Sequence, residues 1–157
     1  MGHIEESLIK ITSKKPEGDI PRIEIVACYL QKDEDYLFLK KSKGRNEEET
    51  WGVAGGRIEE GETPFKAAIR EVFEETGIKV DPESLSFKNL LYVDNPSFGK
   101  YLLHIHSYCC SKDEKVLLSD EHTDYKWLPL ACAKKLTLLS GGLKSMTYFE
   151  KSLAQEK

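Results

Sequence analysis

The sequence GRIEEGETPFKAAIREVFEETGI, from Gly56 to Ile78, carries the strongest structural signal in this chain of 157 residues. Gly56 follows a second glycine, and two glycines give a loop an unrestricted backbone. Thr63 is a residue type that caps helices, and Pro64 suits the first helical position. Gly77 stands where a left-handed C-cap is favoured. The sequence therefore predicts a glycine loop that leads into a helix over residues 64–76.

That helix is predicted to have two unlike faces, because successive residues are about 100° apart around its axis. Acidic residues fall on one face, where Glu71, Glu74 and Glu75 are spaced i, i+3 and i+4. Carboxylates that crowd together repel one another, and a hard divalent cation relieves this by taking oxygen ligands. A solvated acidic face without a ligand is the alternative. The opposite face carries apolar residues and one threonine: Phe65, Ile69, Val72 and Thr76, flanked by Ala68 and Phe73.

The whole stretch resembles the Nudix box, the signature of the Nudix hydrolase superfamily. That pattern is Gly, five residues, Glu, seven residues, then Arg-Glu-aliphatic-any-Glu-Glu-any-Gly-aliphatic. The resemblance favours a metal-binding face over a solvated one. All fixed positions of the pattern are filled: Gly56, Glu62, Arg70, Glu71, Val72, Glu74, Glu75, Gly77 and Ile78.

The resemblance implies an α/β fold, the Nudix α/β/α sandwich, in which a mixed β-sheet lies between the box helix and a C-terminal helix. It also implies hydrolysis of a diphosphate linkage in a nucleoside diphosphate linked to another moiety, with Mg²⁺ (or Mn²⁺) as cofactor. Under this resemblance Glu71, Glu74 and Glu75 are metal ligands. Gly55 can add its backbone carbonyl, because no side chain blocks the approach of the cation.

Two further roles come from the same resemblance. Arg70 and Glu62 form an ion pair that holds the helix against the loop, so we expect them to orient the site rather than to transfer protons. The general base is either Glu71 or an acid on a distant loop. Glu121 fits the second description and could also bind metal, since it lies six residues before Trp127 and resembles a loop acid of the nucleoside-triphosphate-hydrolysing branch. A solvated loop carboxylate is the alternative for Glu121.

Composition narrows the class of protein. The net charge is −4 and the pI about 5.7, which argues against an extended nucleic-acid partner, since that needs a basic stripe. No apolar run approaches the roughly 20 residues of a membrane span, and no signal peptide is recognisable. The four cysteines lack Cys-x-x-Cys spacing, so we expect reduced thiols and a cytoplasmic protein.

The rest of the chain predicts a polar N-terminal leader over residues 1–20 and a single domain over 21–157. Strands are expected at 22–31, 36–40, 51–54, 84–93 and 100–110. Residues 125–130 are expected to form a short strand followed by the start of a helix, and the remainder is expected to be helical, with a break at 141–142. In the charged loop 41–50, Lys41, Lys43 or Arg45 could contact substrate phosphate. His104 and His106 are expected to be hydrogen-bonded sheet residues rather than metal ligands, since no third ligand is spaced to join them. Candidates for stacking on a base are Tyr36, Phe38, Trp51, Phe98 and Tyr101.

Substrate choice is the least determined property. Little sequence precedes the first strand for the extra N-terminal sheet that many ADP-sugar members use to dimerise, which favours a nucleoside triphosphate or dinucleoside polyphosphate. An ADP-ribose or nucleotide-sugar pyrophosphatase, and a non-catalytic Nudix-fold nucleotide-binding module, are the alternatives. An RNA cap-removing enzyme would need a basic channel that the sequence lacks. Monomer and homodimer stay equally open.

Overall fold

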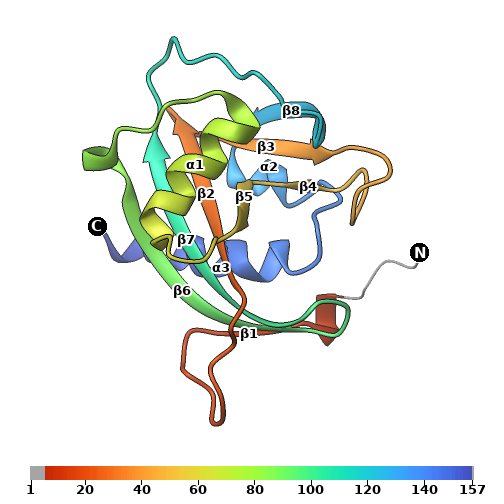
Figure 1. Ribbon diagram of the computed structural model, residues 1–157. Helices are drawn as coiled ribbons and strands as arrows, with labels where there is room; N and C mark the ends of the chain where they lie inside the picture. The colour runs from red at the N-terminus through yellow and green to blue at the C-terminus, as the bar shows by residue number, and fades with distance from the viewer. Residues whose placement is uncertain (1–5, 157) are drawn as a thin grey trace.

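A mixed β-sheet forms the centre of the computed structural model, which describes residues 6–156 (Figure 1). Its strands follow the order β1-β6-β7-β2-β3-β4, while β5 pairs with β2 and β8 pairs with β3. The β2–β7 pair is parallel and the other pairs are antiparallel. The strands are β1 (Lys10–Thr12), β2 (Glu24–Lys32), β3 (Asp35–Lys41), β4 (Trp51–Gly52), β5 (Ala54–Arg57), β6 (Ser86–Asn95), β7 (Gly99–Cys109) and β8 (His122–Leu128). The helices are α1 (Pro64–Thr76), α2 (Leu130–Ala133) and α3 (Gly142–Gln155), with 3₁₀ turns at Glu6–Leu8 and Pro82–Ser84.

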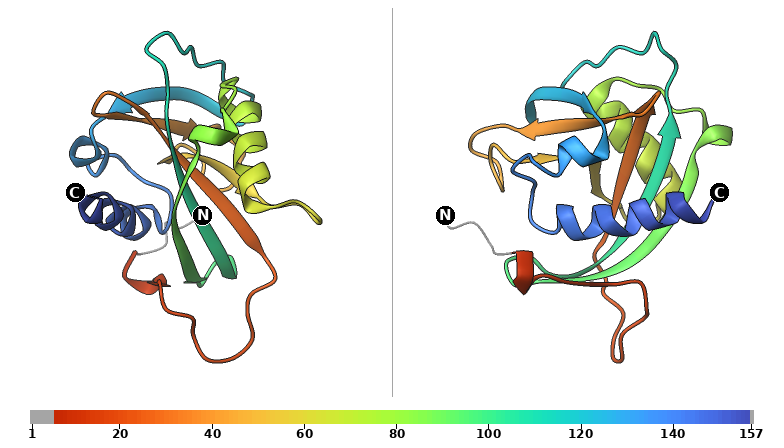
Figure 2. Two further views of the ribbon diagram at one scale, coloured as in Figure 1. Left: turned by 90° about the vertical axis from the view of Figure 1, so that its left-hand side faces the viewer. Right: turned by 180° about the vertical axis from the view of Figure 1, so that it is seen from behind.

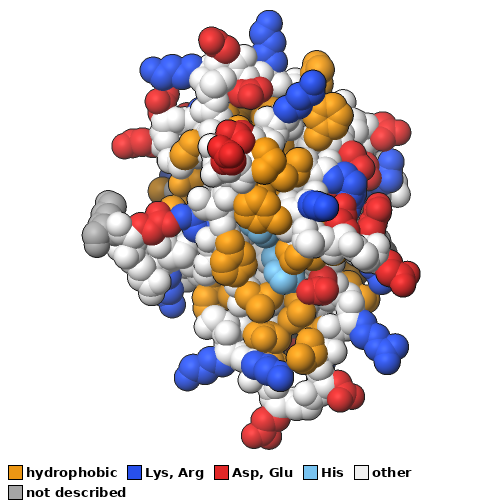
Figure 3. Space-filling model, turned by 60° about the vertical axis from the view of Figure 1, so that its left-hand side comes forward, with side chains coloured by type: hydrophobic (Ala, Val, Ile, Leu, Met, Phe, Trp, Pro, Cys, Tyr) orange, Lys and Arg blue, Asp and Glu red, His pale blue; other side chains and the backbone are white. Residues whose placement is uncertain are grey.

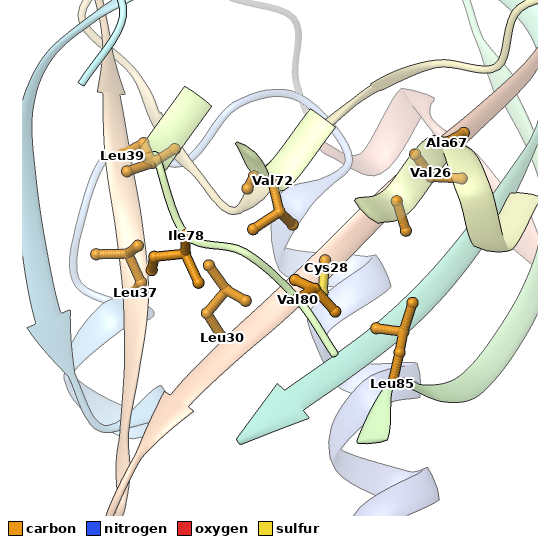
Figure 4. Close-up of a cluster of buried hydrophobic side chains, with 12 residues drawn as sticks. Val26, Cys28, Leu30, Leu37, Leu39, Ala67, Val72, Ile78, Val80 and Leu85 are labelled. Atoms are coloured by element: carbon orange, nitrogen blue, oxygen red, sulfur yellow. The ribbon is translucent and has the colours of Figure 1, made fainter. Parts of the chain in front are cut away.

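Helices cover both faces of this sheet, with α1 on one side and α3 on the other (Figure 2). A hydrophobic core lies in each of the two interfaces. Figure 4 shows the core between α1 and the sheet, where Val72 and Ile78 meet Leu30 and Leu37. The second core is built around Phe149 and Met146 of α3. The predicted α/β/α sandwich is therefore confirmed.

The capping residues predicted both ends of α1 correctly. Thr63 caps the helix, since its side chain accepts a hydrogen bond from the Lys66 amide at 3.1 Å. Gly77 ends it in the left-handed region at φ 74°, and its N–H donates to the Phe73 carbonyl at 2.9 Å. The predicted division of faces is partly wrong. Phe73 is 48% exposed, whereas Glu75 is only 4% exposed because it turns toward β5.

Two expected elements differ from the structure. The predicted strand at 51–54 is two short strands, β4 and β5, separated by Val53. The stretch between α2 and α3 is not helical, because its backbone is hydrogen-bonded to β4. The Trp51 N–H donates to the Thr137 carbonyl at 2.9 Å, and the Leu139 N–H donates to the Trp51 carbonyl at 3.0 Å. These backbone bonds compete directly with the helix that its sequence pattern suggests.

The N-terminal segment belongs to the fold. β1 pairs with β6, and Ile9 beside it has 0% exposure. The Glu6 carboxylate accepts hydrogen bonds from the Gly141 and Lys144 amides, at 2.9 and 3.1 Å, and so caps α3, whose N-cap glycine has no side chain to do so. The prediction of a separate leader is therefore wrong for residues 6–12, while residues 1–5 lie outside the described chain.

The two strand histidines lie on the face of β7 beside α1. Figure 3 shows a small histidine surface surrounded by hydrophobic side chains. His104 contacts the Glu24 carboxylate at 2.9 Å, as an ordinary sheet histidine would. His106 is 1% exposed and meets the rings of Phe65 and Phe87 edge-on, but its Nδ1 has no partner among the described residues. The expected hydrogen bonding thus holds for His104 only.

Candidate active site

The glycine loop brings two carboxylates of α1 against the backbone of β5. The Gly55 N–H donates to Glu75 Oε1 at 2.8 Å. A Cβ atom added to Gly55 would lie 2.2 Å from the Val26 carbonyl, and one added to Gly56 would lie 2.4 Å from the Glu71 carboxylate. Both distances are far inside van der Waals contact, so only glycine allows α1 and β5 to approach this closely.

These two carboxylates lie in a setting that disfavours their negative charge. Burial raises the pKa of Glu75 to about 9; the Gly55 N–H partly offsets this, and the charges of Glu71 and Glu121 add to the rise. Burial also raises the pKa of Glu71, against the opposing effect of Arg70. Buried carboxylates of this kind become charged readily only when a cation neutralises them.

Arg70 ties the loop to the helix. Its guanidinium donates to both oxygens of Glu62, at 2.7 and 2.9 Å, and to Glu71 Oε1 at 2.8 Å. It also donates to the Arg57 carbonyl at 3.1 Å. The hydrogen bonds from Arg70, followed by one from the Glu59 amide, lower the pKa of Glu62 to about 2. The expected ion pair between Arg70 and Glu62 is therefore present, and it is bidentate, the geometry that best fixes the relative orientation of the two side chains.

Glu121 and His122 enter the site from the start of β8. One ligand atom from each of Glu75, Glu121 and His122 lies within 4.8 Å of the other two. Ser42 anchors this segment, because its N–H donates to the Glu121 carbonyl at 2.9 Å and its hydroxyl donates to the Asp120 carbonyl at 2.8 Å. The loop expected to carry Glu121 to the face of α1 does reach it.

The sequence reasoning did not single out His122. It is 7% exposed, and its pKa is lowered to about 4, first by burial and then by the charge of Lys41. Its position next to Glu121 was the available signal. An adjacent residue in a regular strand points to the opposite face, however, so adjacency alone does not bring both side chains to one site.

Two cavities flank the glycine loop. One, of about 240 Å³, is lined by Glu75 and His122 together with Lys41 and Gly55. The other, of about 690 Å³, is lined by Glu71, Glu74 and Arg70 among others. Glu74 has a side chain that is 54% exposed and lies 3.3 Å from Arg70, so the structure does not bring it into the cluster of Glu75, Glu121 and His122.

The remaining residues proposed from the sequence differ in burial and in whether they line the site. Lys41 lines the smaller cavity, Arg45 is 3.6 Å from the Asp120 carboxylate, and Lys43 is exposed. Among the aromatic candidates, Phe98 is 42% exposed and Tyr101 is partly buried. Three others belong to the core on the α3 side and offer no free ring face to a ligand: Tyr36, Phe38 and Trp51.

The donor set of this cluster fits a divalent cation. It combines two carboxylates with one imidazole, and Nδ1 of that imidazole is buried without a partner among the described residues. Carboxylate oxygens suit hard divalent ions, and imidazole nitrogen is a common additional ligand.

No helix in the range 6–156 is both long and apolar enough to cross a bilayer.

Comparison with known proteins finds similar sequences and similar structures. The NUDIX domain model matches residues 21–148. Dihydroneopterin triphosphate diphosphatase of Escherichia coli (strain K12) is 30% identical over 124 residues, covering 72% of this chain and 81% of that protein. Nucleoside triphosphatase NudI of Escherichia coli (strain K12) is 29% identical over 112 residues, covering 66% and 79%. Among solved structures, the MutT protein from Methanosarcina mazei Go1 superposes with a TM-score of 0.71 at 22% identity, over 90% of this chain and 99% of that one.

Proposed function

The chain belongs to the Nudix family of pyrophosphohydrolases, and from that premise we propose that it hydrolyses a nucleoside triphosphate or dinucleoside polyphosphate with the help of Mg²⁺ (or Mn²⁺). The observation that carries the proposal is the convergence of Glu75 and Glu121 beside the glycine loop, with Glu71 next to them. The two similar enzymes are named for triphosphates, which supports this substrate class over ADP-ribose or a nucleotide sugar.

The proposed ligands of the cation are carboxylates of Glu71, Glu74, Glu75 and Glu121, with the carbonyl of Gly55. The exposed position of Glu74 means that it would join the others through a change of side-chain rotamer or through a water molecule. When bound, the cation neutralises phosphate charge and lowers the pKa of water. The carboxylates of α1 would hold the cation in the site.

The chain's own residues divide the remaining work. Water attacks a phosphorus of the diphosphate linkage, the bond from that phosphorus to the bridging oxygen breaks, and the proton of the water passes to a carboxylate. Glu71 and Glu121 are the two candidates for that carboxylate. Arg70 and Glu62 keep the loop and helix in register, because their paired hydrogen bonds join the two. Lys41, at the wall of the smaller cavity, supplies positive charge to the phosphates.

The experiment is a screen of purified protein against a panel of nucleotides with Mg²⁺ or Mn²⁺. The panel contains nucleoside triphosphates, dihydroneopterin triphosphate, a dinucleoside polyphosphate, ADP-ribose and a nucleotide sugar. We expect the triphosphates to release phosphate or pyrophosphate, or the dinucleoside polyphosphate to be split into two nucleotides. The reaction should stop on chelation and return when metal is added. Turnover that persists in excess chelator would remove the metal role.

The same panel separates the alternatives. Faster turnover of ADP-ribose or a nucleotide sugar than of the triphosphates would replace the proposed substrate class. Binding of nucleotides without turnover of any of them would favour the non-catalytic module. A small-molecule nucleotide as partner follows from the proposal, while the cytoplasmic location and the choice between monomer and homodimer stay predictions from the sequence.

A further inference from the structure

His122 lines the proposed site and has a buried ring nitrogen without a partner among the described residues. The side chain is 7% exposed, and its Nδ1 atom has no hydrogen-bond partner among residues 6–156. Burying a polar atom without a partner is unfavourable, and native structures rarely do so without a ligand or water to complete it. The position of His122 therefore calls for a partner from outside residues 6–156, such as a ligand or water.

A β-bulge aims this ring into the site. Where β3 pairs with β8, Lys40 stands opposite Asp124, but Lys41 stands opposite His122, so Thr123 is an extra residue on β8. Side chains of directly opposed residues in an antiparallel pair lie on the same face. Without the extra residue, Thr123 would face Lys41 and His122 would point to the opposite side of the sheet. Bulges beside active sites commonly redirect a side chain in this way.

The space that His122 reaches is also the space that the carboxylates reach. It lines the cavity of about 240 Å³ with Glu75 and Lys41, and its ligand atom lies within 4.8 Å of those of Glu75 and Glu121. Ligand atoms around an octahedral cation are roughly 3–4 Å apart, given metal–ligand distances of about 2.1 Å. Small side-chain rotations would close the cluster to that spacing. His122 Nδ1 makes no hydrogen bond to either carboxylate, so this nitrogen stays free beside them.

We infer that His122 is a nitrogen ligand of the divalent cation, completing a site with Glu75 and Glu121; this inference rests on the proposed function. With His122 the site has both oxygen and nitrogen donors. The glutamates of α1 alone would supply only oxygen donors. Mg²⁺ prefers oxygen ligands, whereas imidazole is a ligand of transition-metal ions. The bulge at Thr123 is then the feature of the backbone that creates this donor set.

The test uses Mn²⁺ as a paramagnetic probe of the whole chain without an affinity tag. Electron spin-echo modulation detects a ¹⁴N nucleus bonded to Mn²⁺, and protein grown with ¹⁵N-labelled histidine shows whether that nitrogen is imidazole. We expect a histidine signal in the wild type and in His104→Gln, a matched control at a partly buried histidine outside the cluster. We expect the signal to vanish in His122→Asn and the Kd for Mn²⁺ to rise by at least ~10-fold, the lower end of losses seen even for outer-shell partners.

The outcomes distinguish this inference from the proposed function. Bound Mn²⁺ without a histidine signal in the wild type overturns the nitrogen ligand and leaves metal-dependent hydrolysis standing. A histidine signal that persists in His122→Asn also overturns it. Failure of the wild type to bind Mn²⁺ at all removes both proposals. Because labelled wild-type protein gives the first readout, the inference stays testable even if His122→Asn does not fold.

Discussion

Replacing Glu75 with glutamine should change how the stability of the metal-free protein depends on pH. The Glu75 carboxyl is buried beside Glu71 and Glu121, and its pKa is raised from 4.5 to about 9. The folded protein therefore keeps this proton where the unfolded chain releases it, so stability falls as pH rises from about 4.5 to about 9. Glutamine has nearly the same shape, stays neutral and can still accept the hydrogen bond from Gly55.

The magnitude follows from one proton. A difference of one bound proton changes the free energy of unfolding by about 1.4 kcal/mol per pH unit. Between about pH 7 and pH 8.5 the wild type should thus lose about 2 kcal/mol that Glu75→Gln does not lose. His122 does not disturb this window, because its pKa is lowered to about 4 and its contribution changes only between that value and 6.5. Charged groups present in both proteins, including Lys41, contribute equally to the pH dependence of both unfolding free energies, so their contributions cancel in the difference.

Urea unfolding in the presence of chelator measures this difference, with Glu83→Gln as the control at an exposed glutamate. We expect the control to follow the wild type. Adding Mn²⁺ should flatten the pH dependence of the wild type, because the metal replaces the proton at Glu75. Parallel stability curves for wild type and Glu75→Gln would refute the reasoning, because they would mean that Glu75 ionises in the folded protein as readily as in the unfolded chain.

Three further variants test other parts of the structure. Glu62→Gln should lower kcat less than Glu75→Gln, because it weakens the contact with Arg70 without removing a metal ligand; steady-state kinetics decide, and a larger loss at Glu62 would reverse the assigned roles. Glu121→Gln should lower kcat by at least ~10²-fold with little change in Tm, while Asp120→Asn should do much less; near-wild-type turnover would leave Glu71 as the base. Glu6→Ala should lower the unfolding free energy by about 1 kcal/mol through loss of the α3 cap, with kcat unchanged; an unaltered Tm would contradict the capping role.

The sequence predicted those features that depend on neighbouring residues. The caps of α1 at Thr63 and Gly77 need only a few residues on either side, so residue type sufficed. The pair of Arg70 and Glu62 lies within the same short motif. The burial of Glu75 was missed, because it depends on how closely α1 approaches β5 and therefore on space left by Gly55. Helical periodicity describes the faces of a helix, but it does not say which part of a face is covered.

The missed features depend on contacts between distant parts of the chain. His122 reaches the site through a bulge that exists only when β8 pairs with β3. β1 has three residues, which is too short for an alternating pattern to stand out, and it is fixed by pairing with β6. The capping of α3 by Glu6 joins residues 135 positions apart in the sequence. Local sequence patterns do not show which distant segments pair with one another, so these contacts could not be predicted before the fold was known.

The docking of residues 6–12 also sets where the chain can be cut for laboratory work. The NUDIX domain match begins at residue 21, so a fragment trimmed to that boundary would lack β1 and the cap from Glu6. The edge of β6 from Tyr92 to Asp94 would then expose unpaired backbone groups, which pair readily with another strand. Oligomers found in such a trimmed preparation would report the missing strand rather than the native assembly of the protein.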